Sequence, residues 1–125
     1  MNQHVKETKV WGTVQHIFHD EDRAAVSYLE VNAGFRCSTH THAWRANQFS
    51  VISGRIIIEE WDSNNKIVST MLYSGESHTV PSGVTHRFRV LESGVVIEVY
   101  WADTIGGAVL LDDITRFNEG GKDDS

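Results

Sequence analysis

The sequence predicts an all-β fold in which about eight or nine short strands close into a barrel or jelly roll. Three observations carry this prediction. Runs rich in Val, Ile, Thr and aromatic residues recur at short spacing, and Gly, Asn, Asp and Ser separate them. No long segment has the period of an amphipathic helix. The length of 125 residues suits one domain with one core.

The expected strands follow one another with little sequence between them. Acidic residues 20–22 close the first run, and the turn signal at 32–34 closes the second. Ser53-Gly54 is expected to end a strand, whereas residues 62–65 and 92–94 each have the chemistry of a hairpin turn. The expected strands are residues 10–19, 23–31, 35–42, 48–52, 55–61, 67–73, 76–80, 85–91 and 95–102.

The chain is expected to form one domain over residues 1–125, with no internal linker. The barrel itself is predicted to span about residues 9–117. Both termini are expected to fray, because residues 120–125 are small or charged and offer nothing apolar to bury.

Composition and charge exclude several classes of partner. The formal net charge is −6 and no basic run is present, so we expect no nucleic-acid partner. No apolar stretch approaches the roughly 20 residues that span a bilayer, and residues 1–9 lack the apolar core of a signal peptide. The single cysteine, Cys37, forms no internal disulfide and is expected to be a small buried side chain. We therefore expect a cytoplasmic protein with no membrane partner.

Three histidines lie in two segments that also contain glycines at fixed spacings. His40 and His42 are two residues apart, so on an extended strand both imidazoles leave the same face. If a later strand brings His86 to that face, three neutral nitrogen donors converge and can hold a transition metal with open positions. The alternative is three histidines packed in a polar barrel mouth. The first segment contains Gly34, His40, His42, Asn47 and Gly54, and the second contains Gly75, Pro81, Gly83 and His86.

This arrangement resembles the two motifs of the cupin superfamily. The resemblance implies a single-domain cupin, that is, a double-stranded β-helix or jelly-roll barrel with a metal held by His40, His42 and His86. The first cupin motif usually ends in a glutamate ligand, and here that position is Asn47, whose neutral amide oxygen is a poorer ligand. Asn47 is therefore a possible weak fourth contact. The sequence leaves the metal open among Zn, Fe, Mn and Ni.

The chain also resembles the C-terminal cupin domain of the mannose-1-phosphate guanylyltransferase/mannose-6-phosphate isomerase family, the type II phosphomannose isomerases. The likeness covers about residues 9–117, and several short matches occur in the right order. They are Lys9-Val10-Trp11-Gly12, the run from His42 to Phe49, the run from Val80 to Arg87, Ile97-Glu98-Val99, and Asp112-Asp113-Ile114-Thr115-Arg116-Phe117.

The resemblance implies a metal-dependent sugar-phosphate isomerase that moves a proton between adjacent carbons of an open-chain sugar. Arg116 would then neutralise a phosphate or a developing oxyanion, unless it pairs with Asp112 or Asp113 on the surface. Asn47 cannot accept a proton, so the base must be another residue. Glu98 and Tyr100 share one face of their strand, and they are candidates for base and hydrogen-bond donor if that face lines the barrel.

Trp44, Gln48 and Phe49 flank the metal motif and are the candidate substrate-binding residues. Trp44 stands where the isomerase family has histidine, which exchanges a polar group for a large apolar surface. That surface suits stacking against a sugar face or an aromatic substrate. The alternative for Trp44 is packing in the core or in a dimer interface.

The leading hypothesis is a metal-dependent isomerase that acts on a small polyhydroxylated or phosphorylated molecule. A second hypothesis is a three-histidine iron protein that activates dioxygen. A third is a binding module that lost its base together with the glutamate. In each case we expect a small-molecule ligand, and the family resemblance implies a homodimer.

Overall fold

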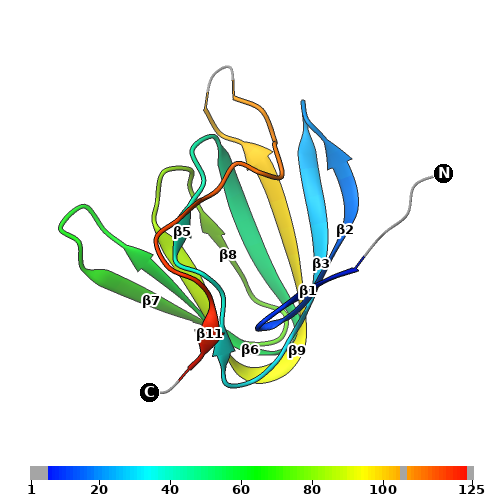
Figure 1. Ribbon diagram of the computed structural model, residues 1–125, viewed down its shortest axis with the longest axis vertical. Helices are drawn as coiled ribbons and strands as arrows, with labels where there is room; N and C mark the ends of the chain where they lie inside the picture. The colour runs from blue at the N-terminus through cyan, green and yellow to red at the C-terminus, as the bar shows by residue number, and fades with distance from the viewer. Residues whose placement is uncertain (1–5, 105–106, 124–125) are drawn as a thin grey trace.

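The described part of the chain forms one antiparallel sheet that curls on itself into a barrel (Figure 1). This computed structural model describes residues 6–104 and 107–123. The sheet has 11 strands, and those ranges contain no helix and hence no helical segment able to cross a membrane. The predicted all-β fold class is confirmed. The strands are β1 (Lys6–Lys9), β2 (Gly12–Asp20), β3 (Ala24–Val31), β4 (Phe35–Arg36), β5 (His40–Thr41), β6 (Arg45–Trp61), β7 (Ile67–Leu72), β8 (Ser77–Val80), β9 (His86–Ala102), β10 (Thr115–Arg116) and β11 (Gly121–Lys122).

The two longest strands, β6 and β9, pair along their length and form the spine of the barrel. The expected hairpin at residues 92–94 is wrong, because β9 runs through it, and β6 likewise continues past Ser53. The register shifts between Val51 and Ile56, where both strands bend together. A Cβ on Gly94 would lie 2.1 Å from the Ser53 carbonyl oxygen, so only glycine permits this close approach. Gly94 therefore marks a bend inside β9 rather than a turn between two strands.

The turn at residues 62–65 does form the expected hairpin, which joins β6 to β7. The Asp62 amide donates to the Lys66 carbonyl at 2.8 Å, and Asn65 has a positive φ of 62°. Asparagine tolerates that left-handed conformation better than most residues. Local turn chemistry therefore predicted this element correctly.

Two short strands, β1 and β11, extend the sheet beyond the predicted barrel range of about 9–117. Strand β1 begins at Lys6 and pairs with β2, and β11 pairs with β4. Asp123 follows β11, and its Oδ2 lies 2.6 Å from Nε of Arg89. Residues 120–123, which were expected to fray, include a strand paired with the sheet, whereas 1–5 and 124–125 lie outside the described residues. Polar segments gain order here from pairing with the sheet rather than from apolar burial.

The core fills the space between the two halves of the curled sheet. Burial alternates along β3, as expected for a strand with one face inward. Cys37 belongs to this core, and burial raises the pKa of its thiol to about 12, as suits a packing residue. The main cluster contains Trp11, Val14, Leu29, Val31, Cys37, Phe49, Val51, Ile56, Ile58, Leu72, Val80, Phe88, Val90 and Val96.

Candidate metal centre

The three motif histidines meet at one end of the barrel. Residue His40 on β5 is the register partner of His86 at the start of β9, and His42 follows β5 directly. Their ring centroids lie 4.5 to 5.2 Å apart, and one nitrogen from each ring lies within 4.8 Å of the others. All three side chains are buried. The structure thus brings together residues that are more than 40 positions apart in the sequence.

Backbone carbonyls fix the orientation of all three rings. The Nδ1 atoms of His40, His42 and His86 lie 2.8, 2.7 and 2.9 Å from the carbonyl oxygens of Ser38, Asp113 and Val84. A carbonyl only accepts, so each Nδ1 carries the proton and each Nε2 keeps its lone pair. The Nε2 atoms of His42 and His86 are buried and have no hydrogen-bond partner among the described residues. Unsatisfied buried acceptors of this kind fit a bound transition metal.

Burial keeps the three rings neutral. It lowers the pKa of His40 to about 2, of His42 to about 3 and of His86 to about 4. The positive charge of Arg45 lowers the pKa values of His42 and His86 further, and the histidines disfavour protonation of one another. Metal binding requires neutral imidazole, so no proton has to leave at neutral pH before these rings can act as ligands.

Asn47 and Glu98 form a buried polar pair beside the histidines. The Asn47 side-chain amide donates to Glu98 Oε2 at 2.8 Å, and its own Oδ1 is buried with no partner among the described residues. Tyr100 also hydrogen-bonds to Glu98. Burial raises the pKa of Glu98, and these two hydrogen bonds oppose the shift. Glu98 and Tyr100 therefore do face the inside of the barrel.

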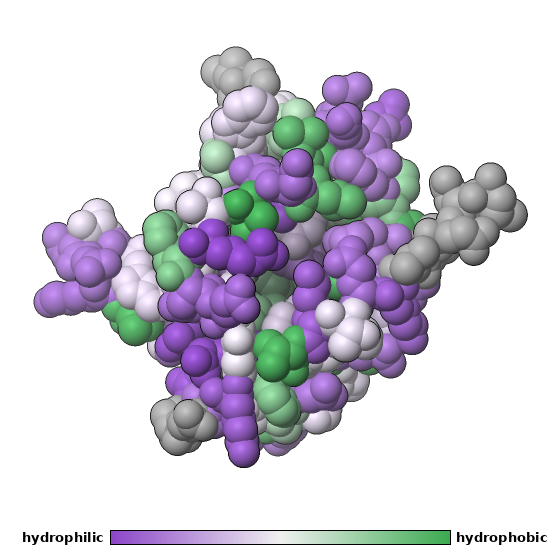
Figure 2. All heavy atoms as spheres, in the orientation of Figure 1, coloured by the Kyte–Doolittle hydropathy of each residue, from purple (hydrophilic) through white to green (hydrophobic). Residues whose placement is uncertain are grey.

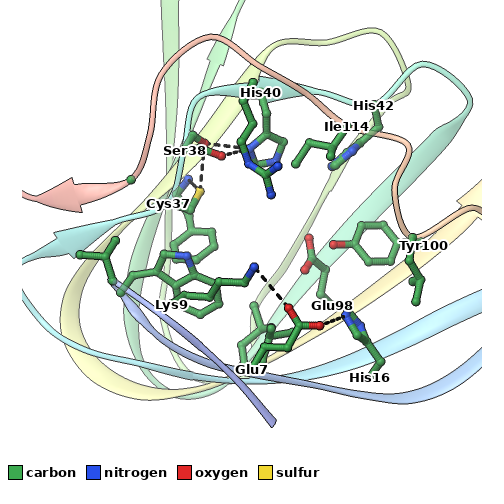
Figure 3. Close-up of a pocket in the computed structure, with 18 of the residues that line it drawn as sticks. Glu7, Lys9, His16, Cys37, Ser38, His40, His42, Glu98, Tyr100 and Ile114 are labelled. Carbon is green, nitrogen blue, oxygen red and sulfur yellow. Dashed lines mark hydrogen bonds and ion pairs between the residues drawn. The ribbon is translucent and has the colours of Figure 1, made fainter. Parts of the chain in front are cut away.

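A cavity of about 710 Å³ opens in front of these groups. Figure 2 shows it as a hollow rimmed largely by hydrophilic side chains. In the close-up, His40 and His42 lie on one side, Glu98 and Tyr100 lie next to them, and Glu7, Lys9 and His16 lie across the opening (Figure 3). Strand β1 thus supplies part of the wall, although residues 1–9 had been expected to lie mostly outside the barrel.

Arg116 and Phe49 also line the cavity. Arg116 is exposed on β10, opposite His40 in register, and makes no ion pair with either neighbouring aspartate in the described part of the chain. Phe49 is 1% exposed, and its ring centroid lies 6.2 Å from that of His86. Arg116 is thus placed at the rim of the cavity and Phe49 deep within it.

Trp44 and Gln48 lie elsewhere. Trp44 is 47% exposed, so the alternative that it packs in the core is wrong. It is also not among the residues that line the cavity. The Asp113 carboxylate accepts the backbone amides of Ala43 and Trp44 at 2.8 and 2.9 Å and thereby fixes this loop. Gln48 points to the opposite face of β6 from Phe49, because side chains alternate along a strand. Neither residue is among those that line the cavity.

Sequence reasoning missed Arg45, which is 3% exposed and lines the cavity. Its guanidinium carbon lies 4.0 Å from the centroid of the Tyr100 ring, and Nη1 donates to the Leu110 carbonyl. The signal was present, because Arg45 shares the period-two face of Asn47 and Phe49.

This fold and its two-segment histidine site define a single-domain cupin. The match to the family described as mannose-6-phosphate isomerase C-terminal covers residues 1–119, and the chain belongs to that family. A comparison with curated proteins found no match.

Solved structures with the same fold include two bacterial proteins. Oxalate decarboxylase from Bacillus subtilis superposes with a TM-score of 0.74 at 15% identity, over 90% of this chain and 30% of that one. The capsular polysaccharide assembling protein CapF from Staphylococcus aureus superposes with a TM-score of 0.70 at 20% identity, over 90% of this chain and 33% of that one. This chain therefore spans about a third of the length of these structures, and the likeness at such identities concerns the fold alone.

Proposed function

We propose that this cupin binds a divalent transition metal through His40, His42 and His86 and catalyses proton transfer in a small oxygenated substrate, as a sugar-phosphate isomerase does. The convergence of three imidazoles, each with Nδ1 tied to a carbonyl and Nε2 left for a ligand, carries the proposal. When bound, the metal would polarise carbonyl and hydroxyl oxygens of the substrate. Zn, Fe, Mn and Ni all suit such a donor set, and the Bacillus decarboxylase contains Mn(II) centres.

Glu98 is the base in this proposal. Its carboxylate lines the cavity, and its buried position gives it a raised affinity for a proton. It can therefore take a proton from one carbon of the substrate and return it to the neighbouring carbon. Tyr100 and Asn47 orient the carboxylate through their hydrogen bonds, and Asn47 Oδ1 remains a possible weak metal contact.

The substrate proposed from the family is small and polyhydroxylated or phosphorylated. Arg116 at the rim supplies a positive charge for a phosphate, and Phe49 forms part of the apolar wall. The cavity volume of about 710 Å³ suits a molecule of this size. The same proposal treats residues 1–125 as one domain that acts as a cytoplasmic homodimer, and light scattering after gel filtration measures its mass in solution.

Metal analysis tests the ligand set. We expect natively purified protein to contain about one transition metal per chain, and His86→Ala to lose at least about 100-fold in metal affinity. His78→Ala is the matched control, because His78 pairs with Glu60 and does not belong to the histidine group. Equal metal content in wild type and His86→Ala would refute the ligand set.

Activity assays test the reaction. Metal-loaded protein is expected to interconvert at least one aldose and ketose phosphate pair in a broad panel. Glu98→Gln is expected to lower kcat by about 100-fold or more while the metal content is retained. Failure of the loaded wild type to bind or interconvert any sugar phosphate counts against the isomerase, and an unchanged kcat in the variant counts against Glu98.

A second candidate is an iron-dependent oxygenase. It is favoured by one observation, namely that the ligand group found among the described residues contains only histidine and no carboxylate. Anaerobic loading with Fe(II), followed by oxygen electrode measurements with small organic substrates, separates the two. Tight zinc binding with no oxygen uptake by the iron form counts against this candidate.

A further inference from the structure

We propose that Arg45 anchors the carboxylate of a small ligand whose apolar part lies against the inner wall of the cavity. Arg45 carries a full positive charge, yet it is 3% exposed and makes no ion pair with any residue described in the structure. A buried cation normally has an anionic partner, because removal of a charge from water is costly unless another charge compensates for it. The buried Glu98 carboxylate is close enough to interact electrostatically with Arg45, but no carboxylate of the described residues forms an ion pair with the guanidinium, so that direct contact is left for an anion from outside the described chain.

The hydrogen bonds of the guanidinium leave one edge available. Nη1 donates to the Leu110 carbonyl, and the Tyr100 ring covers one face at 4.0 Å. Nε is buried and has no acceptor among the described residues. The Nε and Nη2 donors of an arginine lie side by side and match the two oxygens of a carboxylate. A carboxylate at this edge would satisfy both donors at once when the guanidinium turns Nε, which is enclosed here, toward the cavity.

The protein's own carboxylates near the cavity have other partners. Glu98 accepts from Asn47 and Tyr100. Glu7 lies 3.5 Å from Lys9 Nζ and 3.6 Å from His16 Nε2, across the opening from His40 and His42 (Figure 3).

The remaining acidic groups are no closer alternatives. The Asp113 carboxylate accepts two backbone amides, and the side chains of Asp112 and Glu119 are exposed at the rim. None of them forms an ion pair with Arg45 in the described ranges. Arg45 therefore has no carboxylate of the described residues in direct contact, although the charge of Glu98 partly compensates its own.

The rest of the cavity wall suits an apolar group. Core side chains form much of it, namely Trp11, Val14, Leu29, Phe49 and Phe88. One buried guanidinium balances one negative charge among these apolar side chains, whereas the second charge of a phosphate dianion would need a further cation, such as Arg116 at the rim. The inference thus adds a small monocarboxylic acid, bound at Arg45, to the sugar phosphates that are proposed as substrates of the same cavity. It rests on the cavity and does not require the metal.

Calorimetry on chelator-treated protein tests this assignment independently of the metal site. The probes are benzoate, its neutral analogue benzamide, and phenyl phosphate. We expect benzoate to bind at least about tenfold more tightly than benzamide, and more tightly than phenyl phosphate. Arg45→Gln is expected to lower benzoate affinity by about tenfold or more and to abolish the preference over benzamide. Arg55→Gln is the matched control, because it removes the same charge from a residue outside the cavity and should change affinity less than about threefold.

Several results would overturn the inference. They are equal affinity for benzoate and benzamide, unchanged benzoate affinity in Arg45→Gln, no binding of benzoate at millimolar concentration, and phenyl phosphate binding that exceeds benzoate binding. If Arg45→Gln does not fold, as circular dichroism would show, the comparison of the three probes on wild type still decides the matter. A failure here leaves the metal analysis of His86→Ala untouched, so the two proposals fail separately.

Discussion

Acidification of the metal-free protein should destabilise it steeply, because three histidines are buried without a proton. Their pKa values of about 2, 3 and 4 lie below the usual value of 6.5 that holds in the unfolded chain. A depressed pKa contributes stability above about pH 6.5, and that stability is lost as the pH falls toward the folded values. Between about pH 7.5 and about pH 5 each histidine protonates only when the chain unfolds.

The size of the effect follows from the linkage relation. Over that interval one such histidine costs about 2 kcal/mol of unfolding free energy, so three give about 3 to 6 kcal/mol after allowance for their coupling. Urea denaturation of chelator-treated protein at a series of pH values measures it. The matched variant His86→Phe keeps an aromatic ring against Phe49 but removes one titrating group.

The difference between the two pH profiles isolates the histidine. Burial also raises the pKa of Glu98, which acts in the opposite direction, but that contribution is common to both proteins and largely cancels. The slope of unfolding free energy against pH measures how many protons the chain binds on unfolding. We expect this number to be smaller by about one in His86→Phe than in the wild type. Identical slopes in the two proteins, or a wild-type stability that does not change over this range, would refute the burial of neutral histidines.

Three further outcomes are expected. Gly94→Ala should lower the unfolding free energy by about 3 kcal/mol or more, since its Cβ would overlap the Ser53 carbonyl; a loss below about 1 kcal/mol in urea denaturation would show that the strands can separate there. The Cys37 thiol should react with a chromogenic disulfide reagent at least about 100-fold more slowly in the folded protein than in urea, and fast reaction of the native form would contradict its burial. Asn47→Glu should raise the metal affinity by about tenfold or more in chelator competition, because a carboxylate is a stronger ligand than an amide. It should also lower the melting temperature of the metal-free form, because the new carboxylate would lie beside the buried carboxylate of Glu98. An unchanged metal affinity would show that residue 47 does not reach the metal.

Local patterns in the sequence were sufficient for much of the fold and for the histidine group. Short β-rich runs predicted strands, and residues 62–65 predicted their hairpin, because turn dihedrals depend on neighbouring residues. The spacing of His40 and His42, with His86 after the Pro81-x-Gly83 turn, predicted a common site. These features depend on period and turn chemistry, which a single sequence displays.

The same local chemistry failed where the outcome depended on a distant partner. Residues 92–94 have the composition of a hairpin turn, but Ser53 packs against Gly94 and both strands bend instead of turning back. Strands β1 and β11 are short and polar, and they are ordered only because β2 and β4 offer them free edges. The strand propensity of a segment does not show whether another strand has a free edge with which it can pair.

The sequence by itself determined an antiparallel barrel with three histidines positioned to meet, since alternation and turn residues act over a few neighbouring positions. Only the tertiary structure decided which charges lie inside. Residue Arg45 is buried because Leu110 and Tyr100, both far away in the chain, close around it, and Glu98 faces the cavity because of its pairing with β6. Burial and charge compensation are properties of contacts between distant residues, and those contacts exist only once the chain has folded.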